Sequence, residues 1–216
     1  MEAGVSSGTL NLTMSKEYAN GNNGLRRKGD KVKVYVTAPQ VNSFIASTSA
    51  DIKCSSPITG IKKLKVDAST SGEISLSRVQ ATDAVVYAST SGEVDIESLE
   101  SNMFKANAST SGEIDIDNLV ADKVSVDAST SGDVKVDCVN TAALNASAST
   151  SGEVKMEGKA KEIKVDVATA GEFNGSKLIS QEAEVNASLG GTAYVNAVRC
   201  NASNSLGGSV KNYFND

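Results

Sequence analysis

Apolar and polar residues alternate over long stretches of this chain, and the alternation restarts every 20 residues. Five glycines mark the restarts: Gly72, Gly92, Gly112, Gly132 and Gly152. The positions two and four residues after each glycine are apolar, as in Ile74 and Leu76, and so mostly are those four, six and eight residues before it. Alternation of period two indicates β-strands with one buried face, because helices bury residues three and four apart.

The 20-residue period comes from a seven-residue motif, Ala68–Ile74, that returns with little change. Its close copies are Ala88–Val94, Ala108–Ile114, Ala128–Val134 and Ala148–Val154. A strict period in this range is typical of a solenoid, whereas a propeller blade needs about 40 residues. Serine, threonine and β-branched residues dominate the repeat, which favours strands over helices. The sequence therefore predicts an all-β, single-stranded β-helix (β-solenoid) of about eight coils, stacked about 4.8 Å apart.

The repeats are expected to span residues 46–210, and they become irregular at both ends. Ala46–Ile52 is an imperfect first copy, and the pattern decays through Val167–Phe173, Ala187–Ala193 and Asn201–Val210. Terminal repeats of a solenoid are atypical because they cap an exposed edge. Residues 1–45 are predicted to be N-terminal strands or a cap, with strands at Thr9–Met14 and Lys31–Thr37 and a turn at Asn20–Gly24. Residues 211–216 are predicted to be a C-terminal tail.

Each coil is predicted to have two strands and two turns. The Ser-Gly pair forms one corner, where glycine supplies backbone freedom, and a second turn is expected near Ala81–Asp83. One threonine in each repeat stands two residues before the glycine, at an even position. These are Thr70, Thr90, Thr110, Thr130 and Thr150. Their side chains are therefore expected to point inward, while the serines on either side face water.

Acidic residues repeat on the outward face after each glycine. Two adjacent repeats carry three each: Glu93, Asp95, Glu97, Glu113, Asp115 and Asp117. Stacked carboxylates about 5 Å apart repel each other by about 1 kcal/mol in water. The cluster is therefore either a solvated face or a site for a hard cation such as calcium, which oxygen ligands suit. A flat sheet surrounds an ion poorly, so the solvated face is the favoured interpretation and no resident cofactor is predicted.

Composition excludes several functions. The 216 residues carry 21 Lys and Arg against 26 Asp and Glu, a net charge of -5, which argues against a nucleic-acid partner. There is no histidine, which excludes Ser-His-Asp and Cys-His triads and histidine-bearing zinc sites. No apolar run is long enough to span a membrane. The three cysteines, Cys54, Cys138 and Cys200, lie far apart and are expected to be small buried residues.

Tandem Ala-Ser-Thr-Ser-Gly-Glu/Asp units after Lys31–Pro39 resemble the putative auto-transporter adhesin head GIN domain family. The resemblance covers residues 31–210. The family occurs in secreted or surface proteins of Bacteroidetes and is largely of unknown function. The resemblance implies a right-handed β-helix, export from the cytoplasm and an adhesin role. Family members usually carry more strand sequence before Gly8–Leu12, which suggests an altered or truncated N-terminal cap here. The family offers no catalytic residues to transfer.

These observations predict a non-enzymatic, exported module with an adhesive or structural role and a glycan or cell-envelope protein as partner. The alternative is a polysaccharide-processing enzyme of the pectate lyase-like β-helix type, using paired carboxylates. An active site should interrupt the repeat, and here the acids recur in every coil. A second alternative is a cation-stabilised scaffold. The sequence leaves the ligand, the oligomeric state and the export route open.

Overall fold

The computed structural model describes residues 2–13 and 32–214. The chain divides into two compact units, Met1–Ala38 and Pro39–Asp216. In the first, β1 (Glu2–Ser6) and β2 (Thr9–Thr13) form an antiparallel hairpin. Its two-residue turn, Ser7 and Gly8, has positive φ at both positions, as the right-handed twist of a hairpin favours. The strand predicted at Thr9–Met14 is confirmed as far as Thr13.

The strand predicted at Lys31–Thr37 is wrong for residues 32–37, which form no strand and are exposed. Val32, Val34 and Val36 alternate as a strand would, yet all three side chains are exposed. Alternation predicts a strand only where the apolar face meets a partner, and none of the described strands pairs with this segment. Lys31 and the turn predicted at Asn20–Gly24 lie outside the described residues.

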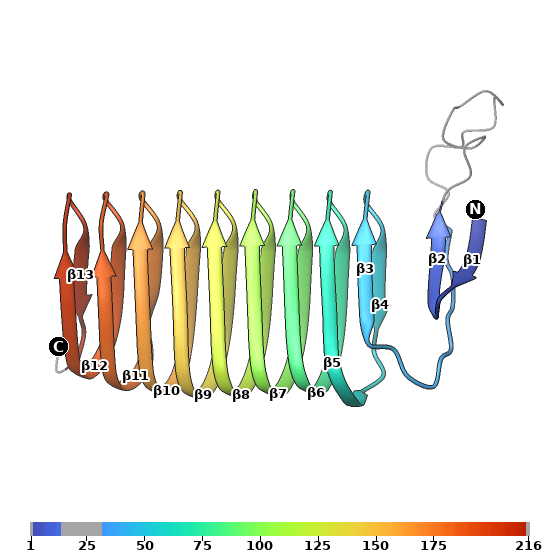
Figure 1. Cartoon of the computed structure of the whole chain (residues 1–216), viewed down its shortest axis with the longest axis horizontal. Coiled ribbons are helices and arrows are strands. Elements are labelled where there is room, and N and C mark those ends of the chain that lie inside the picture. Colours follow the sequence, from blue (N-terminus) through green and yellow to red (C-terminus); the bar gives the residue numbers. More distant parts are fainter. Residues whose placement is uncertain (1, 14–31, 215–216) are drawn as a thin grey trace, which may run out of the picture. The chain divides into compact units, whose positions relative to one another are not determined.

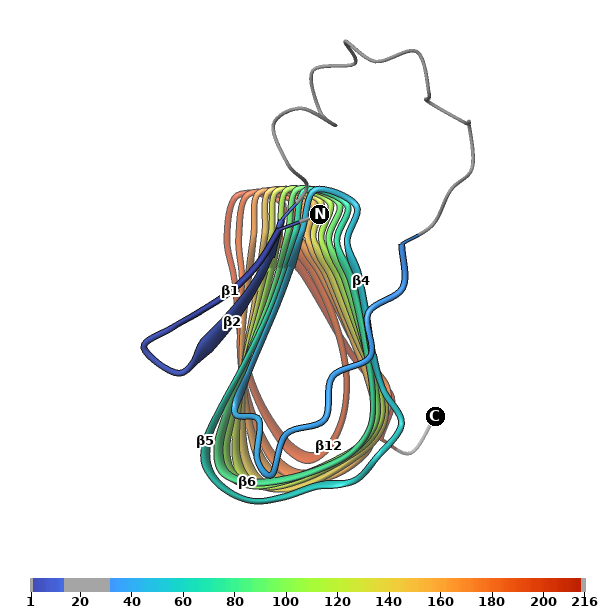
Figure 2. The same cartoon turned by 90° about the vertical axis from the view of Figure 1, so that its right-hand side faces the viewer.

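The second unit is a β-solenoid of about eight coils, as predicted (Figure 1). Its strands are β3 (Ser43–Ser47), β4 (Asp51–Cys54), β5 (Ile58–Ser69), β6 (Glu73–Ser89), β7 (Glu93–Ser109), β8 (Glu113–Ser129), β9 (Asp133–Ser149), β10 (Glu153–Ala168), β11 (Glu172–Ala187), β12 (Thr192–Asn204) and β13 (Ser209–Asn212). All neighbours in this sheet are parallel. The winding is right-handed, and the coils superpose in one elongated, roughly triangular outline in Figure 2.

Equivalent residues of successive coils lie on top of one another. Ile74 pairs with Val94, which pairs with Ile114, and the column continues through Val134 and Val154. All five side chains are buried. The other predicted inward positions on both sides of the glycine are likewise buried throughout β5–β10, except for the threonines two residues before it. The 20-residue register is therefore confirmed, and one continuous apolar core runs through the coils.

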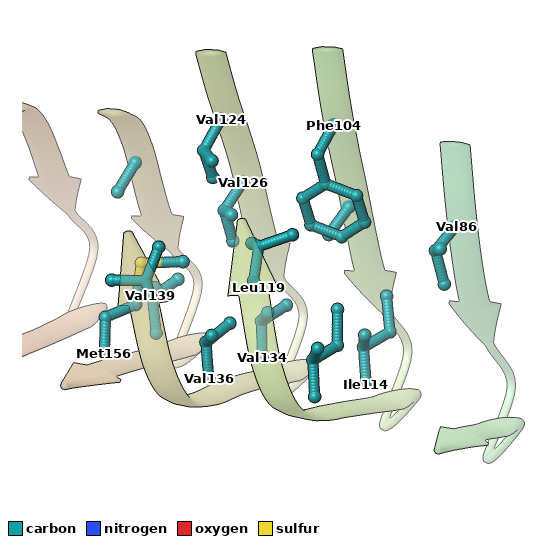
Figure 3. Close-up of a cluster of buried hydrophobic side chains, with 14 of the residues drawn as sticks. Val86, Phe104, Ile114, Leu119, Val124, Val126, Val134, Val136, Val139 and Met156 are labelled. Atoms are coloured by element: carbon teal, nitrogen blue, oxygen red, sulfur yellow. The ribbon is translucent and has the colours of Figure 1, made fainter. Parts of the chain in front are cut away.

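The expected second turn near Ala81–Asp83 is replaced by two bends within a continuous strand. β6 runs unbroken from Glu73 to Ser89, and the register with β7 skips only Ser77 and Thr82. At each bend the inward positions shift by one residue. A further buried column results, which consists of Val79, Leu99, Leu119 and Val139. Figure 3 labels Leu119 and Val139 of this column. A strict period of two missed this column because these residues stand at an odd spacing from the glycine.

The structure of the corner between coils contradicts the prediction that the repeated threonines point inward. In the turn Ser69–Gly72, the Gly72 N–H donates to the Ser69 carbonyl at 2.9 Å. Thr70 and Ser71 have φ values of 51° and 59°, and both are exposed. Two central residues with positive φ indicate a type I′ turn. The threonine column therefore faces water, not the core, because the left-handed backbone turns these side chains outward.

The glycine of each corner is required for space and not for backbone freedom. Gly72 does not have a positive φ. A Cβ at Gly72 would overlap the carbonyl group of Ala46 in the preceding coil, and one at Gly92 would overlap that of Ala68. Close approach of two backbones is the other role that only glycine fills. The Ala-Ser-Thr-Ser-Gly motif is thus the sequence of a tightly stacked corner.

The cysteines are less buried than predicted. Cys54 and Cys200 are half-buried and pack against the core, whereas Cys138 is exposed. Cys138 stands in β9 beside the first bend, where the inward phase changes. The prediction of buried cysteines is therefore wrong for Cys138.

Candidate functional site

The outward residues of the strand segments that follow each corner form one polar face, which we call the carboxylate face. One of its columns is Glu73, Glu93, Glu113, Asp133, Glu153 and Glu172. The column beside it is Ser75, Asp95, Asp115, Lys135, Lys155, Asn174 and Tyr194. Alternation in the strand places both columns outward, while Ile74 and its equivalents point into the core.

The six predicted cation ligands lie on two adjacent strands of this face. Glu93 pairs with Glu113, and Asp95 pairs with Asp115, between β7 and β8. Glu97 and Asp117, the remaining two, follow at the first bend of the same strands. The structure thus brings the acids of the two coils side by side, about 4.8 Å apart in the direction of stacking.

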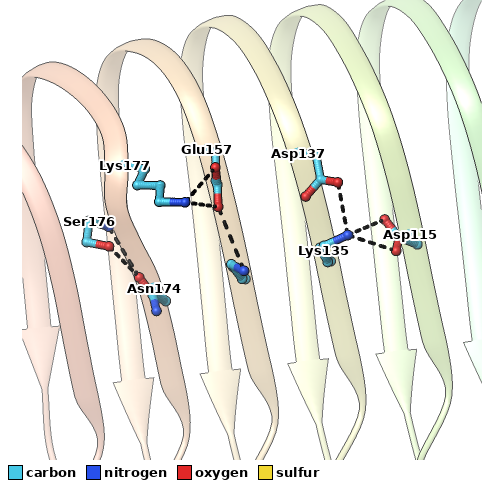
Figure 4. A network of polar contacts seen from close by, with 8 residues as sticks. Asp115, Lys135, Asp137, Glu157, Asn174, Ser176 and Lys177 are labelled. Atoms are coloured by element: carbon cyan, nitrogen blue, oxygen red, sulfur yellow. Dashed lines mark hydrogen bonds and ion pairs between the residues drawn. The ribbon is translucent and has the colours of Figure 1, made fainter.

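A lysine from the next coil neutralises part of this cluster (Figure 4). Lys135 Nζ lies 3.1 Å from an oxygen of Asp115 and 3.0 Å from an oxygen of Asp137. The bonds to Asp137 and Asp115 raise the pKa of Lys135. One coil further, Glu157 lies 3.2 Å from Lys177 and 3.7 Å from Lys155. Exposed ion pairs contribute about 0–1 kcal/mol each, so these contacts mainly balance charge.

The uncompensated part of the cluster lies around Glu93 and Asp95. Partial burial raises the pKa of Asp95, and repulsion from Asp115 and Glu73 raises it further. Burial also raises the pKa of Glu93, with smaller contributions from Asp95 and Glu113. Both carboxylates are therefore less stable in the charged form than isolated ones. The acidic cluster thus opposes folding at neutral pH in the two coils that carry no lysine on this face.

The carboxylates fit calcium poorly. Among the described residues, one group of three acids has carboxylate oxygens within 4.8 Å of one another: Asp115, Asp117 and Asp137. Two of these, Asp115 and Asp117, belong to the six predicted ligands. Calcium takes six to eight oxygen ligands. Lys135 already bonds to Asp115 and Asp137, so an ion there would have to displace its ammonium group. These residues favour an internally balanced face.

A second feature is a trough of about 750 Å³ that runs along the coils at the second bend. Its floor is the inward column Ala81, Ser101, Ala121 and Thr141. One wall is Gln80, Glu100, Val120 and Asn140, and the other is Thr82, Asn102, Asp122 and Ala142. The trough arises because two outward residues flank one small inward residue in every coil. Its long axis follows the stack, which suits an extended polymer.

Two floor residues of the trough are polar, and they differ in whether their hydroxyl groups form hydrogen bonds. Thr141 Oγ1 donates to the Asp122 carbonyl at 3.2 Å or the Ala143 carbonyl at 3.1 Å. Ser101 Oγ is buried and has no hydrogen-bond partner within the described part of the chain. Sequence reasoning missed the trough because its residues were assigned to a turn. The signal was present in the small residues Ala81, Ser101 and Ala121 at 20-residue spacing.

The structure shows no helix of the length and apolarity needed to cross a bilayer within residues 2–13 and 32–214. Comparison with curated proteins and with solved structures found no significant match. The family model described as "Putative auto-transporter adhesin, head GIN domain" matches residues 1–139 and again residues 130–215. These two matches cover nearly the whole chain, including the solenoid and its repeated corners. The chain therefore belongs to the putative auto-transporter adhesin, head GIN domain family.

Proposed function

We propose that this protein is a non-catalytic adhesive module exposed outside the cell, which binds a glycan or a cell-envelope protein. Membership of an adhesin-like family supports a role at the surface. The observation that carries the proposal is the register of the coils, which holds equivalent outward residues in straight columns from β5 to β11. A partner built of repeating units meets an equivalent outward position again in each coil.

Repetition supplies the affinity in this mechanism. Single polar contacts on an exposed sheet are weak, but contacts on one rigid scaffold act together, so that each later contact forms at high effective concentration. The solenoid loses little conformational entropy on binding because its backbone is already fixed by the parallel ladder. The trough is the part of the surface best shaped for such a partner, since its lining comes from six successive coils, from Gly60 to Lys161.

The chemistry of the carboxylate face supports a binding role over catalysis. Glycosidases need two carboxyl groups with different tasks and different pKa values. Here the acids form columns, and Asp115, Asp137 and Glu157 are bonded to lysines. Such a pattern serves solubility and charge balance. Exposure to polyuronides with calcium, followed by absorbance of unsaturated products, tests the enzymatic alternative.

The test of the proposed function is binding of the immobilised full chain to cell-envelope fractions, separated into polysaccharide and protein. The proposal predicts saturable retention of one fraction. A double variant that fills the trough, Asn102→Tyr with Ala142→Tyr, should reduce retention. The matched control, Ser125→Tyr, places the same side chain on an outward position of the last segment of a coil. Failure of the unaltered chain to retain any envelope fraction would contradict the proposal.

A further inference from the structure

An aromatic cluster lies at the C-terminal end of the carboxylate face. Tyr194 of β12 stands in the same outward column as Asp115 and Lys135, next to Asn174 of β11. Tyr213 follows β13, and the two tyrosine rings lie 6.2 Å apart at an angle of 51°. Both side chains are half-buried. The column of Asp115 and Lys135 therefore changes to Asn174 and Tyr194, and it ends at Lys211.

The end of the sheet fixes Tyr213 in place. The Asn212 side chain imitates a further backbone rung: its Oδ1 accepts from Ala197 N–H at 3.0 Å, and its Nδ2 donates to the Ala197 carbonyl at 2.9 Å. The Tyr213 N–H donates to the Val195 carbonyl at 2.8 Å. Lys211 Nζ lies 4.1 Å from the centre of the Tyr213 ring, within the range of a cation–π interaction. These contacts fix the backbone at Tyr213 and place a cation against its ring.

Neutral hydrogen-bonding groups border the two rings. Asn174 Oδ1 accepts from the Ser176 hydroxyl at 2.8 Å, which orients the amide (Figure 4). Its Nδ2 has no hydrogen-bond partner among the residues that the structure describes. Asn196 Nδ2 donates to the Ser176 carbonyl at 3.2 Å. A half-buried amide with a free donor, fixed beside a tyrosine ring, is arranged to bond to a ligand that contacts the ring.

We propose that Tyr194, Tyr213 and Asn174 form a subsite for one neutral sugar residue of a glycan, on the carboxylate face and separate from the trough. A pyranose ring has an apolar face of C–H groups, which packs on an aromatic face, and a rim of hydroxyls, which bonds to amides. This inference rests on the proposed function and names the class of its ligand.

The competing explanation is that the tyrosines only shield the last coil from water. Both explanations predict some loss of stability when Tyr194 is truncated, so stability alone does not separate them. Sugar binding separates them, because a shielding role leaves it unchanged. Tyr194→Phe keeps the ring, so it should retain both binding and stability.

The experiment measures binding of a panel of neutral oligosaccharides, cellohexaose, maltohexaose, mannohexaose and chitohexaose, to the full chain. Calorimetry gives affinity, and saturation-transfer NMR identifies which sugar protons touch the protein. We expect at least one to bind, with a loss of about tenfold or more for Tyr194→Ala and a smaller loss for Asn174→Ala. The matched control is Tyr87→Ala, an exposed tyrosine with Lys65 5.8 Å from its ring centre.

Two results would overturn the subsite: no binding of any of the four oligosaccharides, or equal affinity in the unaltered chain and a folded Tyr194→Ala variant. If Tyr194→Ala does not fold, Tyr213→Ala and Asn174→Ala carry the same comparison. The retention experiment on envelope fractions tests the proposed function independently of the subsite. Retention of an envelope fraction by both the unaltered chain and Tyr194→Ala would reject the subsite and leave the adhesive role, whereas no retention by the unaltered chain would reject the adhesive role itself.

Discussion

Substitution of Gly112 by alanine tests the physical role of the repeated glycine. An added Cβ would overlap the Ala88 carbonyl of the preceding coil, so the corner that joins β7 to β8 would have to move away from the end of β6. Overpacking of this kind costs about 1–3 kcal/mol. The shift also strains two backbone hydrogen bonds of 2.9 Å, from Gly112 N–H to the Ser109 carbonyl and from Asp133 N–H to the Gly112 carbonyl. With about 0.5–1 kcal/mol from these bonds, the expected loss is about 2–4 kcal/mol.

Thermal unfolding followed by far-ultraviolet circular dichroism measures this loss, which corresponds to a decrease in Tm of roughly 4–16 °C for a chain of this size. Gly4→Ala is the control for the substitution itself, since no atom lies within 4 Å of a Cβ there. Thr110→Asn tests the other half of the argument. Thr110 has a φ of 52°, which asparagine tolerates better, so this variant should gain up to about 1 kcal/mol. A Gly112→Ala variant as stable as the unaltered chain would refute the reasoning.

Three further predictions concern the trough and the carboxylate face. Ser101→Ala should stabilise the fold by about 1 kcal/mol because it removes a buried hydroxyl without a partner. Thr141→Ala in the same column should destabilise the fold, because it removes a hydroxyl that is hydrogen-bonded. Urea denaturation measures both changes, and equal effects of the two substitutions would contradict the prediction. Asp95→Asn should raise Tm at pH 7. The pKa of Asp95 is higher in the folded than in the unfolded chain, so its destabilising effect is present above the folded pKa and disappears as the pH falls below 3.8, the ordinary pKa of an aspartate. Asp115→Asn should give no such gain, since Asp115 bonds to Lys135. Calcium in place of chelator should leave Tm unchanged; a rise that Asp117→Asn abolishes would establish a calcium site.

The fold was predictable because its signal is repeated. Ile74 and its equivalents at 20-residue spacing identify a strand period and a coil length together, and one coil therefore predicts the next. The segment Val32–Thr37 has the same alternation without the repetition, and it forms no strand. A local pattern indicates which face can be buried, but the partner that buries it is a property of the fold.

Details of the corner and the bends were not predictable from alternation. The inward column that contains Leu119 breaks the period of two, because a bend allows one extra residue without leaving the ladder. Thr110 and Ser111 adopt a positive φ, which residues other than glycine and asparagine rarely do. The repeated glycine indicated an unusual corner correctly, but its physical role depends on the Ala88 carbonyl, a contact with the previous coil.

The candidate site was predictable in part. The sequence indicated which acids share a face, and the structure places Asp95 beside Asp115 as that reasoning requires. It did not indicate that Lys135 would lie between Asp115 and Asp137, because the direction of a long side chain depends on its neighbours. The pairing of Tyr194 with Tyr213 was also hidden, since the last coils depart from the 20-residue spacing.

The most direct measurement of the stacked-coil arrangement is a set of distances between corners by pulsed electron paramagnetic resonance. Spin labels at Ser71 and, in turn, Ser131, Ser151 and Ala170 would span three, four and five coils, in a background without the native cysteines. In-register stacking predicts that the mean distance rises by about 5 Å with each additional coil. Distances that stay constant, or that rise irregularly with coil number, would contradict the solenoid and the binding surface derived from it.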